Sequence, residues 1–452
     1  MKIVVVGGGK IGSALLEQLA KENHRVTLVD KSRRVVTDIT NSFDVLGVCG
    51  NGATVATQNE AGVPSADLLI ACTNSDEMNL LCCLVAKKLG AKYTIARVRN
   101  PEYNSQVQLI REELGLSMVI NPDLVTAREL FRMLRFPSAI DIDTFSGGRA
   151  ELVGLRVREN SVLSGLQLRD LPKKVGARVL ICIVQRGEDV FIPSGDFILR
   201  SGDIIRIAAS RKNLEAFFGV LGALKREVGS VMMIGGSRIS FYLSQMLLAI
   251  GVDVKIIEQN EARAVELCEL LPKAMIINGD ATDQSVLLEE GIDNTDAVVT
   301  LTGSDEENII IAMYATGRNV PKVIAKVSRP SLSGLVAAAG LESAVSPRDI
   351  TANQMAQYVR AVQNSIGSNV ETLYSIAGGR VEALEFAVRS QSPDIVGVPL
   401  SKLSLKENIL IACITRGSEI IIPGGDTVIM KGDNVVVVTT NPGLNDLLDI
   451  LK

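Results

Sequence analysis

Strand-sized apolar runs alternate with helical stripes along the first part of the chain. Residues 2–6 form a β-branched apolar run, and a second run at residues 25–29 ends in Asp30. Runs of this length and composition are typical of buried parallel strands. The apolar residues between the two runs follow the period of a helix and are Ile11, Leu15, Leu16 and Leu19. The chain therefore opens with a predicted strand–helix–strand unit.

The same alternation continues beyond Asp30. Strands are predicted at residues 45–49, 67–72 and 93–98, and helices at residues 54–61 and 78–89. Such a pattern favours a doubly wound parallel sheet with helices on both faces. Thr73-x-x-Asp76 also fits a capping box before the second of these helices.

A further helix is predicted to open at Asn121-Pro122, because proline is favoured at the first helical position. It carries an apolar stripe made of Leu124, Ala127, Phe131 and Leu134. Because this helix follows a complete sheet, its stripe has two possible partners, its own domain or another subunit. The sequence leaves both open.

The alternation of strand-sized and helical patterns stops between residue 139 and about residue 221. Short β-like runs at residues 151–157, 177–185, 189–192 and 203–208 are separated by turn signals such as Pro193-Ser194-Gly195-Asp196. This stretch predicts a small α+β domain that is rich in strands.

The whole arrangement then recurs at an offset of about 228 to 230 residues. Glu258 corresponds to Asp30, Thr302 to Thr73, and Lys326 to Arg97. We therefore predict an α/β fold with two tandem Rossmann-like parallel-sheet domains, each followed by a small α+β domain. The predicted domains cover residues 1–137, 138–227, 228–366 and 367–452.

Gly7, Gly9 and Gly12 form G-x-G-x-x-G between the first strand and its helix. The first glycine allows a tight turn, the second lets the backbone approach a pyrophosphate, and the third lets the helix lie close to the strand. Asp30 stands where a carboxylate can accept hydrogen bonds from a ribose 2′-hydroxyl. The pattern indicates a nucleotide site and disfavours a 2′-phosphate, so NADP is not the expected ligand.

Charge, hydropathy and cysteine content exclude several functional classes. The net charge is −4 and no Lys/Arg cluster is interleaved with aromatic residues, so nucleic-acid binding has little support. No apolar run approaches the ~18–20 residues that span a bilayer, and we expect no signal peptide before the first strand. We expect a cytoplasmic chain whose seven cysteines are mostly buried and reduced. No C-x-x-C occurs, and His24, the sole histidine, is expected to be a solvated turn residue, so neither a metal site nor a histidine base is expected.

The tandem order resembles the RCK family (regulators of potassium conductance), and in particular the cytosolic regulatory subunits of Trk-type potassium uptake systems. The resemblance implies a non-enzymatic, peripheral membrane protein that binds NAD(H) or ATP/ADP. It also implies a homo-oligomer, expected to be a tetramer, under a membrane-embedded potassium channel subunit on the inner face of the cell membrane. The first implied pocket comprises Gly7, Gly8, Gly9, Lys10, Ile11, Asp30, Asn51, Gly52, Thr73, Asn74 and Arg97. The second comprises Gly235, Gly236, Ser237, Arg238, Ile239, Glu258, Asp280, Ala281, Thr302 and Lys326.

The second half departs from the glycine pattern, because Ser237 and Ser240 replace Gly9 and Gly12. We expect Ser237 to crowd a pyrophosphate and Ser240 to push its helix away from the strand. Two alternatives to the regulatory function stay open. One is an NAD-dependent oxidoreductase, which would need an acid/base group beside the nicotinamide. The other is a nucleotide-sensing subunit of another transporter.

Overall fold

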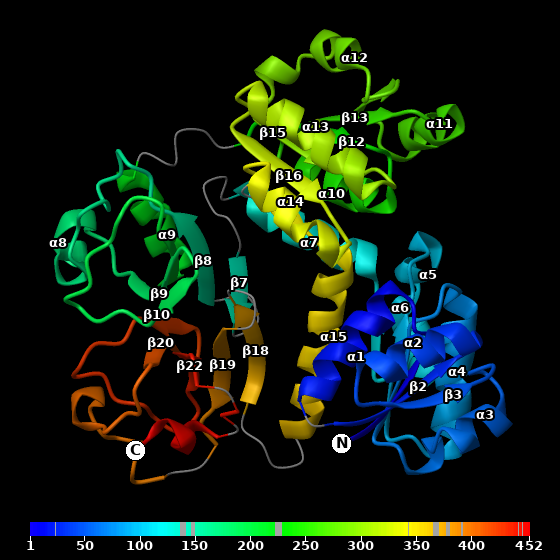
Figure 1. Cartoon of the computed structure of the whole chain (residues 1–452), viewed down its shortest axis with the longest axis horizontal. Coiled ribbons are helices and arrows are strands. Elements are labelled where there is room, and N and C mark those ends of the chain that lie inside the picture. Colours follow the sequence, from blue (N-terminus) through cyan, green and yellow to red (C-terminus); the bar gives the residue numbers. More distant parts are fainter. Residues whose placement is uncertain are drawn as a thin grey trace. The chain divides into compact units, whose positions relative to one another are not determined.

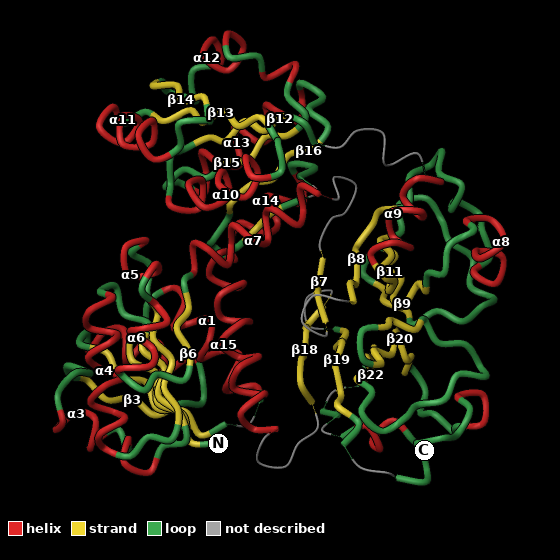
Figure 2. Tube along the Cα trace, turned by 180° about the vertical axis from the view of Figure 1, so that it is seen from behind, coloured by secondary structure: helices red, strands yellow, loops and turns green. Residues whose placement is uncertain are grey.

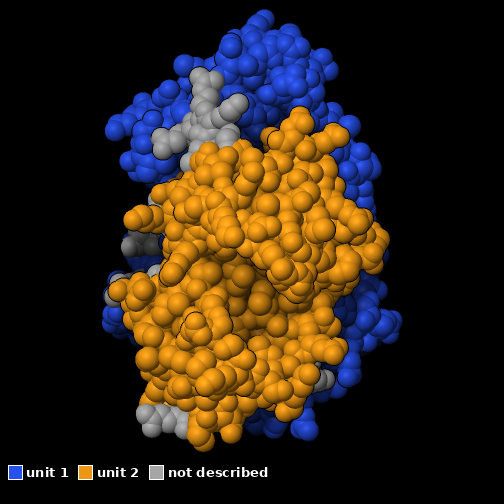
Figure 3. All heavy atoms as spheres, turned by 90° about the vertical axis from the view of Figure 1, so that its left-hand side faces the viewer, with its two compact units in different colours: residues 1–131, 229–359 blue, residues 132–228, 360–452 orange. Residues whose placement is uncertain are grey.

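The computed structural model describes residues 1–22, 24–135, 142–145, 150–221, 228–341, 343–364, 370–376, 380–389, 392–441, 443–444 and 446–452. The chain divides into two compact units, coloured separately in Figure 3. One unit contains residues 1–131 and 229–359, and the other contains residues 132–228 and 360–452. Each unit therefore takes one part from each half of the repeat.

A six-stranded parallel sheet with the strand order of Rossmann folds, β3-β2-β1-β4-β5-β6, forms the first part of unit one (Figure 1). Its strands are β1 (Lys2–Val6), β2 (Arg25–Asp30), β3 (Leu46–Cys49), β4 (Leu68–Ala71), β5 (Tyr93–Arg97) and β6 (Met118–Ile120). The associated helices are α1 (Lys10–Lys21), α2 (Arg33–Ser42), α3 (Val55–Glu60), α4 (Asp76–Leu89), α5 (Pro101–Ser105), α6 (Val107–Glu113) and α7 (Pro122–Arg135).

The second half repeats this sheet in the order β14-β13-β12-β15-β16-β17. Its strands are β12 (Ser230–Ile234), β13 (Asp253–Glu258), β14 (Met275–Asn278), β15 (Ala297–Thr300), β16 (Lys322–Lys326) and β17 (Ala344–Val345). Its helices are α10 (Arg238–Ala249), α11 (Glu261–Leu270), α12 (Gln284–Glu289), α13 (Asp305–Gly317), α14 (Ser333–Ala338) and α15 (Pro347–Asn364). The predicted fold class is confirmed, including the duplication.

Short polar side chains fix where the helices begin. Ser32, Thr54 and Ser75 accept a backbone N–H in the first turn of α2, α3 and α4. The corresponding caps of α11 and α13 are Asn260 and Ser304. Each cap satisfies a backbone donor that the helix itself leaves unpaired.

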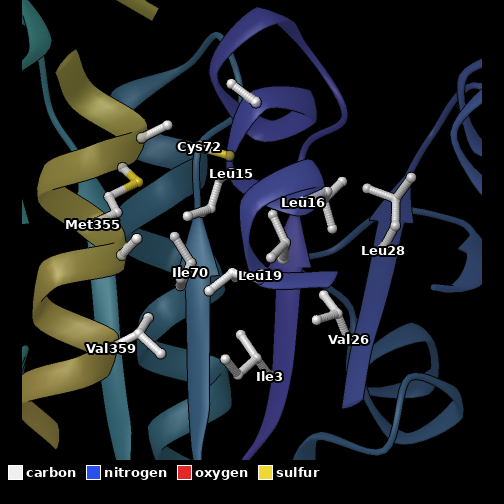
Figure 4. Packing of buried hydrophobic residues seen from close by; sticks show 14 of the residues in the cluster. Ile3, Leu15, Leu16, Leu19, Val26, Leu28, Ile70, Cys72, Met355 and Val359 are labelled. Atoms are coloured by element: carbon white, nitrogen blue, oxygen red, sulfur yellow. The ribbon is translucent and has the colours of Figure 1, made fainter. Parts of the chain in front are cut away.

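Helix α15 comes from the second half but packs on the first sheet. Its residues Met355 and Val359 are fully buried in one apolar cluster with Ile3, Leu15 and Ile70 (Figure 4). The ion pair between Arg348 Nη2 and Glu17 Oε2, 3.8 Å apart, joins α15 to α1.

Helix α7 makes the reciprocal contact. It lies beside α10 in both views of the trace (Figures 1 and 2), and Asn121 Nδ2 donates to Tyr242 Oη on α10 at 3.1 Å. Within the predicted stripe, Ala127 and Leu134 are buried and Leu124 and Phe131 are half-buried. The two halves thus exchange helices within unit one, an arrangement that the sequence did not predict.

Unit two contains two antiparallel sheets, with the orders β10-β9-β11-β8-β7 and β18-β19-β22-β20-β21. The first has β7 (Ile142–Phe145), β8 (Ala150–Arg156), β9 (Leu180–Arg186), β10 (Asp189–Phe191) and β11 (Ile204–Ser210), with helices α8 (Leu171–Val175) and α9 (Arg211–Val220). The second has β18 (Val370–Ile376), β19 (Val381–Ala387), β20 (Ile409–Arg416), β21 (Glu419–Ile421) and β22 (Asn434–Thr439).

The two antiparallel sheets share a core and repeat one polar contact. Cys182 of the first sheet and Cys413 of the second are buried in the same apolar cluster. Arg186 binds the buried Asp203 through two hydrogen bonds of 2.8 Å. Arg416 binds the equivalent Asp433 at 2.9 and 2.8 Å. Two-point pairing of this kind satisfies a carboxylate that would be costly to bury alone.

Several expectations need correction or are untested. His24 is not solvated: only 7% of it is exposed, and its Nδ1 lies 3.4 Å from the amino group of Met1. Cys49 and Cys268 are exposed, whereas the other five cysteines are buried. The predicted domain boundaries at 137 and 366 lie outside the described residues. None of the described helices is both long enough and apolar enough to cross a membrane.

We predict that Met355→Ala loosens the first sheet although Met355 belongs to the second half. Removing a fully buried methionine leaves a cavity and typically costs about 2–5 kcal/mol. Amide hydrogen exchange of β1 and β4 should therefore accelerate strongly. Met313→Ala is the matched control, because Met313 is 45% exposed on α13. Equal exchange rates of β1 and β4 in both variants would contradict the exchange of helices.

Candidate functional site

The candidate sites lie at the carboxyl edges of the two parallel sheets, where the loops after β1, β2, β3, β4 and β5 meet. Gly7 has φ +104°, a left-handed conformation that favours glycine, and a Cβ there would come within 3.0 Å of the backbone of Cys72 and Thr73. A Cβ on Gly12 would lie 1.9 Å from the Gly7 carbonyl oxygen. A Cβ on Gly9 would meet no protein atom within 4 Å, so the space above Gly9 is open.

The acid at the end of the second strand holds the glycine loop. Asp30 Oδ2 accepts the N–H of Gly8 at 2.8 Å, and Oδ1 accepts the N–H of Ser32 at 2.8 Å. Glu258 repeats this arrangement with Gly236, at 2.5 Å, and with Asn260, at 2.7 Å. Each carboxylate oxygen keeps a further acceptor position. The acid therefore braces the loop and can still accept a hydroxyl.

The loop after the third strand approaches the first. A Cβ on Gly52 would lie 2.3 Å from Val6 Cγ1, so a side chain there would require Val6 to shift. Gln58 Nε2 donates to the Gly52 carbonyl at 2.7 Å. In the second half, Ala281 is buried and the exposed Asp280 accepts from the hydroxyl and the N–H of Thr282. These two hydrogen bonds lower the pKa of Asp280.

A buried asparagine organises each loop that follows the fourth strand. Asn79 Oδ1 accepts the N–H of Thr73 at 2.8 Å, and Asn79 Nδ2 donates to the Arg97 carbonyl at 2.9 Å. Asn308 makes the same bonds to Thr302, at 2.9 Å, and to Lys326, at 3.0 Å. Sequence reasoning missed both asparagines. Their shared place in the repeat, on the inner face of each helix, was the available signal.

The predicted capping box at Thr73 is wrong. The cap of α4 is Ser75, whose Oγ accepts the N–H of Met78 at 3.1 Å. The Thr73 hydroxyl instead donates to Asn79 Oδ1, at 2.7 Å. Asp76 is also used elsewhere, because its Oδ2 accepts the N–H of Arg99 and of Asn100. The local spacing fitted a cap, but tertiary partners compete for both side chains.

A cation stands at the end of the fifth strand in each half. Arg97 is only 6% exposed, and its Nε has no hydrogen-bond partner among the described residues. Burial lowers the pKa of Arg97 and of Lys326. Lys326 Nζ donates to the Thr302 carbonyl. A buried, incompletely paired cation is well suited to an anionic ligand.

The second glycine loop accommodates its serines through hydrogen bonds. Ser240, at the position of Gly12, donates its Oγ hydrogen to the Gly235 carbonyl at 2.5 Å. Ser237 caps α10 by accepting the N–H of Ser240 at 3.2 Å. The loop borders a hollow of about 360 Å³ whose wall includes Gly236, Ser237 and Glu258. Ser240 thus bonds the helix directly to the loop, and the displacement of the helix that we expect from its side chain stays a prediction.

The remaining predicted residues divide into two groups. Lys10 and Arg238 are the first residues of α1 and α10 and are exposed, as is Asn74. Ile11 is half-buried and Ile239 is 5% exposed, so they serve packing more than contact with a ligand. The structure thus brings the predicted residues of each half to one sheet edge, and their role in binding stays a prediction.

Comparison with known protein families identifies the same two kinds of domain, each present twice. Residues 3–122 and 231–347 match the TrkA-N domain, and residues 152–222 and 383–452 match the TrkA-C domain. The chain belongs to the TrkA family.

Relatives within the TrkA family match along almost the whole chain. One is the Trk system potassium uptake protein TrkA homolog 1 of Methanosarcina mazei, 33% identical over 445 residues that cover 97% of each chain. Another is the Trk system potassium uptake protein TrkA homolog of Archaeoglobus fulgidus, 35% identical over 437 residues that cover 97% of each chain. The solved GsuK channel bound to NAD has a similar fold, with a TM-score of 0.62 and 19% identity over 97% of this chain and 77% of that chain.

We predict that Lys326→Met leaves the free energy of unfolding at pH 7 unchanged or raises it by up to about 1 kcal/mol. Burial penalises the charged lysine, and the Thr302 carbonyl keeps its bond from Asn308 Nδ2 at 3.3 Å. Because the pKa of Lys326 is lowered in the folded state, the unfolded chain binds this proton more tightly, and the penalty disappears as the pH rises toward about 10.4.

Urea unfolding at several pH values measures this difference. Lys273→Met removes the same charge from an exposed position and should change little. A Lys326→Met variant that is clearly less stable at pH 7, or whose advantage grows with pH, would contradict the prediction.

Proposed function

We propose that this chain is the nucleotide-sensing regulatory subunit of a Trk-type potassium uptake system and has no catalytic turnover of its own. Membership of the TrkA family and the names of its relatives, which are Trk system potassium uptake proteins, support the potassium uptake system. The proposed ligands are NAD(H) and ATP or ADP, bound at the two carboxyl edges by the residues predicted from the sequence.

The duplicated acid-to-loop brace carries the nucleotide proposal. In each half a carboxylate at the second strand's end fixes the glycine loop, at Gly8 and at Gly236. The loop leads directly into a helix N-terminus, whose backbone donors favour phosphate. Arg97 and Lys326 add positive charge at the fifth strand's end. The similarly folded GsuK channel is described as bound to NAD.

The partner is proposed to be a membrane-embedded potassium channel subunit at the inner face of the cell membrane. The chain is proposed to assemble as a homo-oligomer, a tetramer in the full complex. A ligand can shift such an assembly only by binding two conformations with different affinity, and a thousandfold bias corresponds to about 4 kcal/mol.

Equilibrium binding of ATP, ADP, NAD and NADH to the purified protein tests the ligand class. We expect saturable binding of at least one of them, with no consumption of NADH over hours of incubation. Turnover of NADH with a small substrate would instead support an oxidoreductase. Copurification with a potassium channel subunit, rather than with another transporter, tests the partner.

The mass in solution tests the assembly. We expect a dimer or tetramer at micromolar concentration. A monomer that persists at this concentration would contradict the proposed oligomer and leave the nucleotide sites untouched.

We predict that Asp30→Ala lowers nucleotide affinity at the first site roughly ten- to a hundredfold. It removes the acceptor for the ribose hydroxyls and the brace of Gly8, and a hydrogen bond to a charged group is worth about 1.5–3 kcal/mol. Asp30→Asn keeps one acceptor oxygen and should lose less. Titration calorimetry measures both.

Asp38→Ala is the matched control for this change. Asp38 carries the same charge on α2, where its side chain is exposed and pairs with Arg34. Its removal should leave affinity within twofold of the wild type. Unchanged affinity in a folded Asp30→Ala protein would place the nucleotide elsewhere.

A further inference from the structure

Arg263 holds the second glycine loop from outside the pocket. It lies in the first turn of α11, where its N–H donates to the cap Asn260 at 3.0 Å. Its Nε donates to the Gly236 carbonyl at 2.7 Å, and its Nη1 lies 2.7 Å from Glu266 Oε2. Its side chain is 25% exposed. The guanidinium is thus held by Glu266 on its own helix and by the Gly236 carbonyl of the loop.

This contact fixes the orientation of one peptide group. In a trans peptide the carbonyl and the following N–H point in opposite directions, and the chain contains no cis peptide among the described residues. Because the Gly236 carbonyl points to α11, the N–H of Ser237 is turned away from α11. That N–H has no acceptor among the described residues, and Ser237 lines the hollow at the second sheet edge.

The first site holds its loop in another way. Val35 occupies the position of Arg263 and contacts Gly8, where an added Cβ would lie 2.5 Å from Val35 Cγ1. Within the described parts of the chain, the Gly8 carbonyl accepts no hydrogen bond. The corresponding peptide, between Gly8 and Gly9, is therefore held by apolar contact alone and has no group that fixes its orientation.

We propose that Arg263 is a positioning residue of the second nucleotide site, which sets the Ser237 N–H to donate to a phosphate of the bound nucleotide. The inference rests on the proposed function, because it requires nucleotide at this edge. A peptide that is already oriented does not have to be turned when the ligand arrives, so binding loses less free energy to ordering.

Two further hydrogen bonds also hold the second glycine loop in one conformation. Ser240 Oγ binds the Gly235 carbonyl, and Ser237 Oγ accepts the N–H of Ser240. The bond from Ser240 Oγ fixes the peptide between Gly235 and Gly236, and Arg263 fixes the next peptide, between Gly236 and Ser237. The second site is therefore preset for a phosphate at one position, whereas the first can adapt to phosphates placed differently.

The test uses the full chain with Gly9→Asp, which silences the first site. A Cβ fits there without meeting protein, and the added negative charge at the start of α1 should repel a phosphate. ADP and adenosine are then titrated against Arg263→Val, which places the first site's residue in the second. We expect ADP affinity to fall about tenfold and adenosine affinity to change less than twofold. A merely structural role would lower both equally.

Two variants serve as controls. Glu266→Gln removes the ion pair but keeps the bond to Gly236, and exposed pairs contribute little, so ADP affinity should stay within twofold. Arg263→Gln retains a side-chain donor and should restore part of the ADP affinity; it also serves if Arg263→Val does not fold.

The possible failures are distinguishable. ADP binding that Arg263→Val leaves unchanged, or a loss shared equally by adenosine, overturns the role of Arg263 and leaves the proposed function standing. No ADP binding by the Gly9→Asp protein overturns both the inference and the proposed second site.

Discussion

A parallel sheet must be covered on both faces, and this constraint ties the two halves of the chain together. Met355 and Val359 of α15 complete the apolar cover of the first sheet, although they follow the second sheet in sequence. The reciprocal contact runs from α7 to α10 through Asn121 and Tyr242. The ion pair between Arg348 and Glu17, 3.8 Å apart, adds to this apolar contact between α15 and α1. The core of the first Rossmann domain is therefore incomplete without α15 of the second half.

Duplication kept the polar framework of each sheet edge and changed the side chains around it. Asp30 and Glu258 each accept a backbone N–H of their glycine loop. Asn79 and Asn308 each donate to the backbone carbonyl at the end of the fifth strand. These groups bond to backbone, so the surrounding residues can vary while the loop keeps its shape. The differences fall where a ligand would lie or where the loop is held from behind, at Arg263 above all. Common geometry with different electrostatics is the arrangement from which two unequal sites can arise.

Much of the fold could be predicted from sequence because it depends on local periodicity and on repetition. Strand runs, the glycine turn and the acid at the end of β2 are all readable within a short window. Long-range partners are not. The Thr73 hydroxyl donates to Asn79 instead of capping α4 as predicted, and the buried His24 lies against the amino group of Met1. The packing of α7 and α15 against the opposite halves could not be predicted either. An apolar stripe indicates that a helix face is buried, but it does not identify the element that buries it.

The two candidate sites are joined by contacts rather than separated by a linker. Asn121 Oδ1 caps α7 by accepting the N–H of Asp123, while its Nδ2 donates to Tyr242 on α10. Helix α10 begins at the second glycine loop, and Asp123 binds Arg99, two residues beyond Arg97 of the first site. Any ligand that moves one sheet edge must either carry these buried groups with it or break their hydrogen bonds, which costs about 1–3 kcal/mol for each group left unpaired. That cost is comparable to the coupling free energies by which one binding site typically biases another.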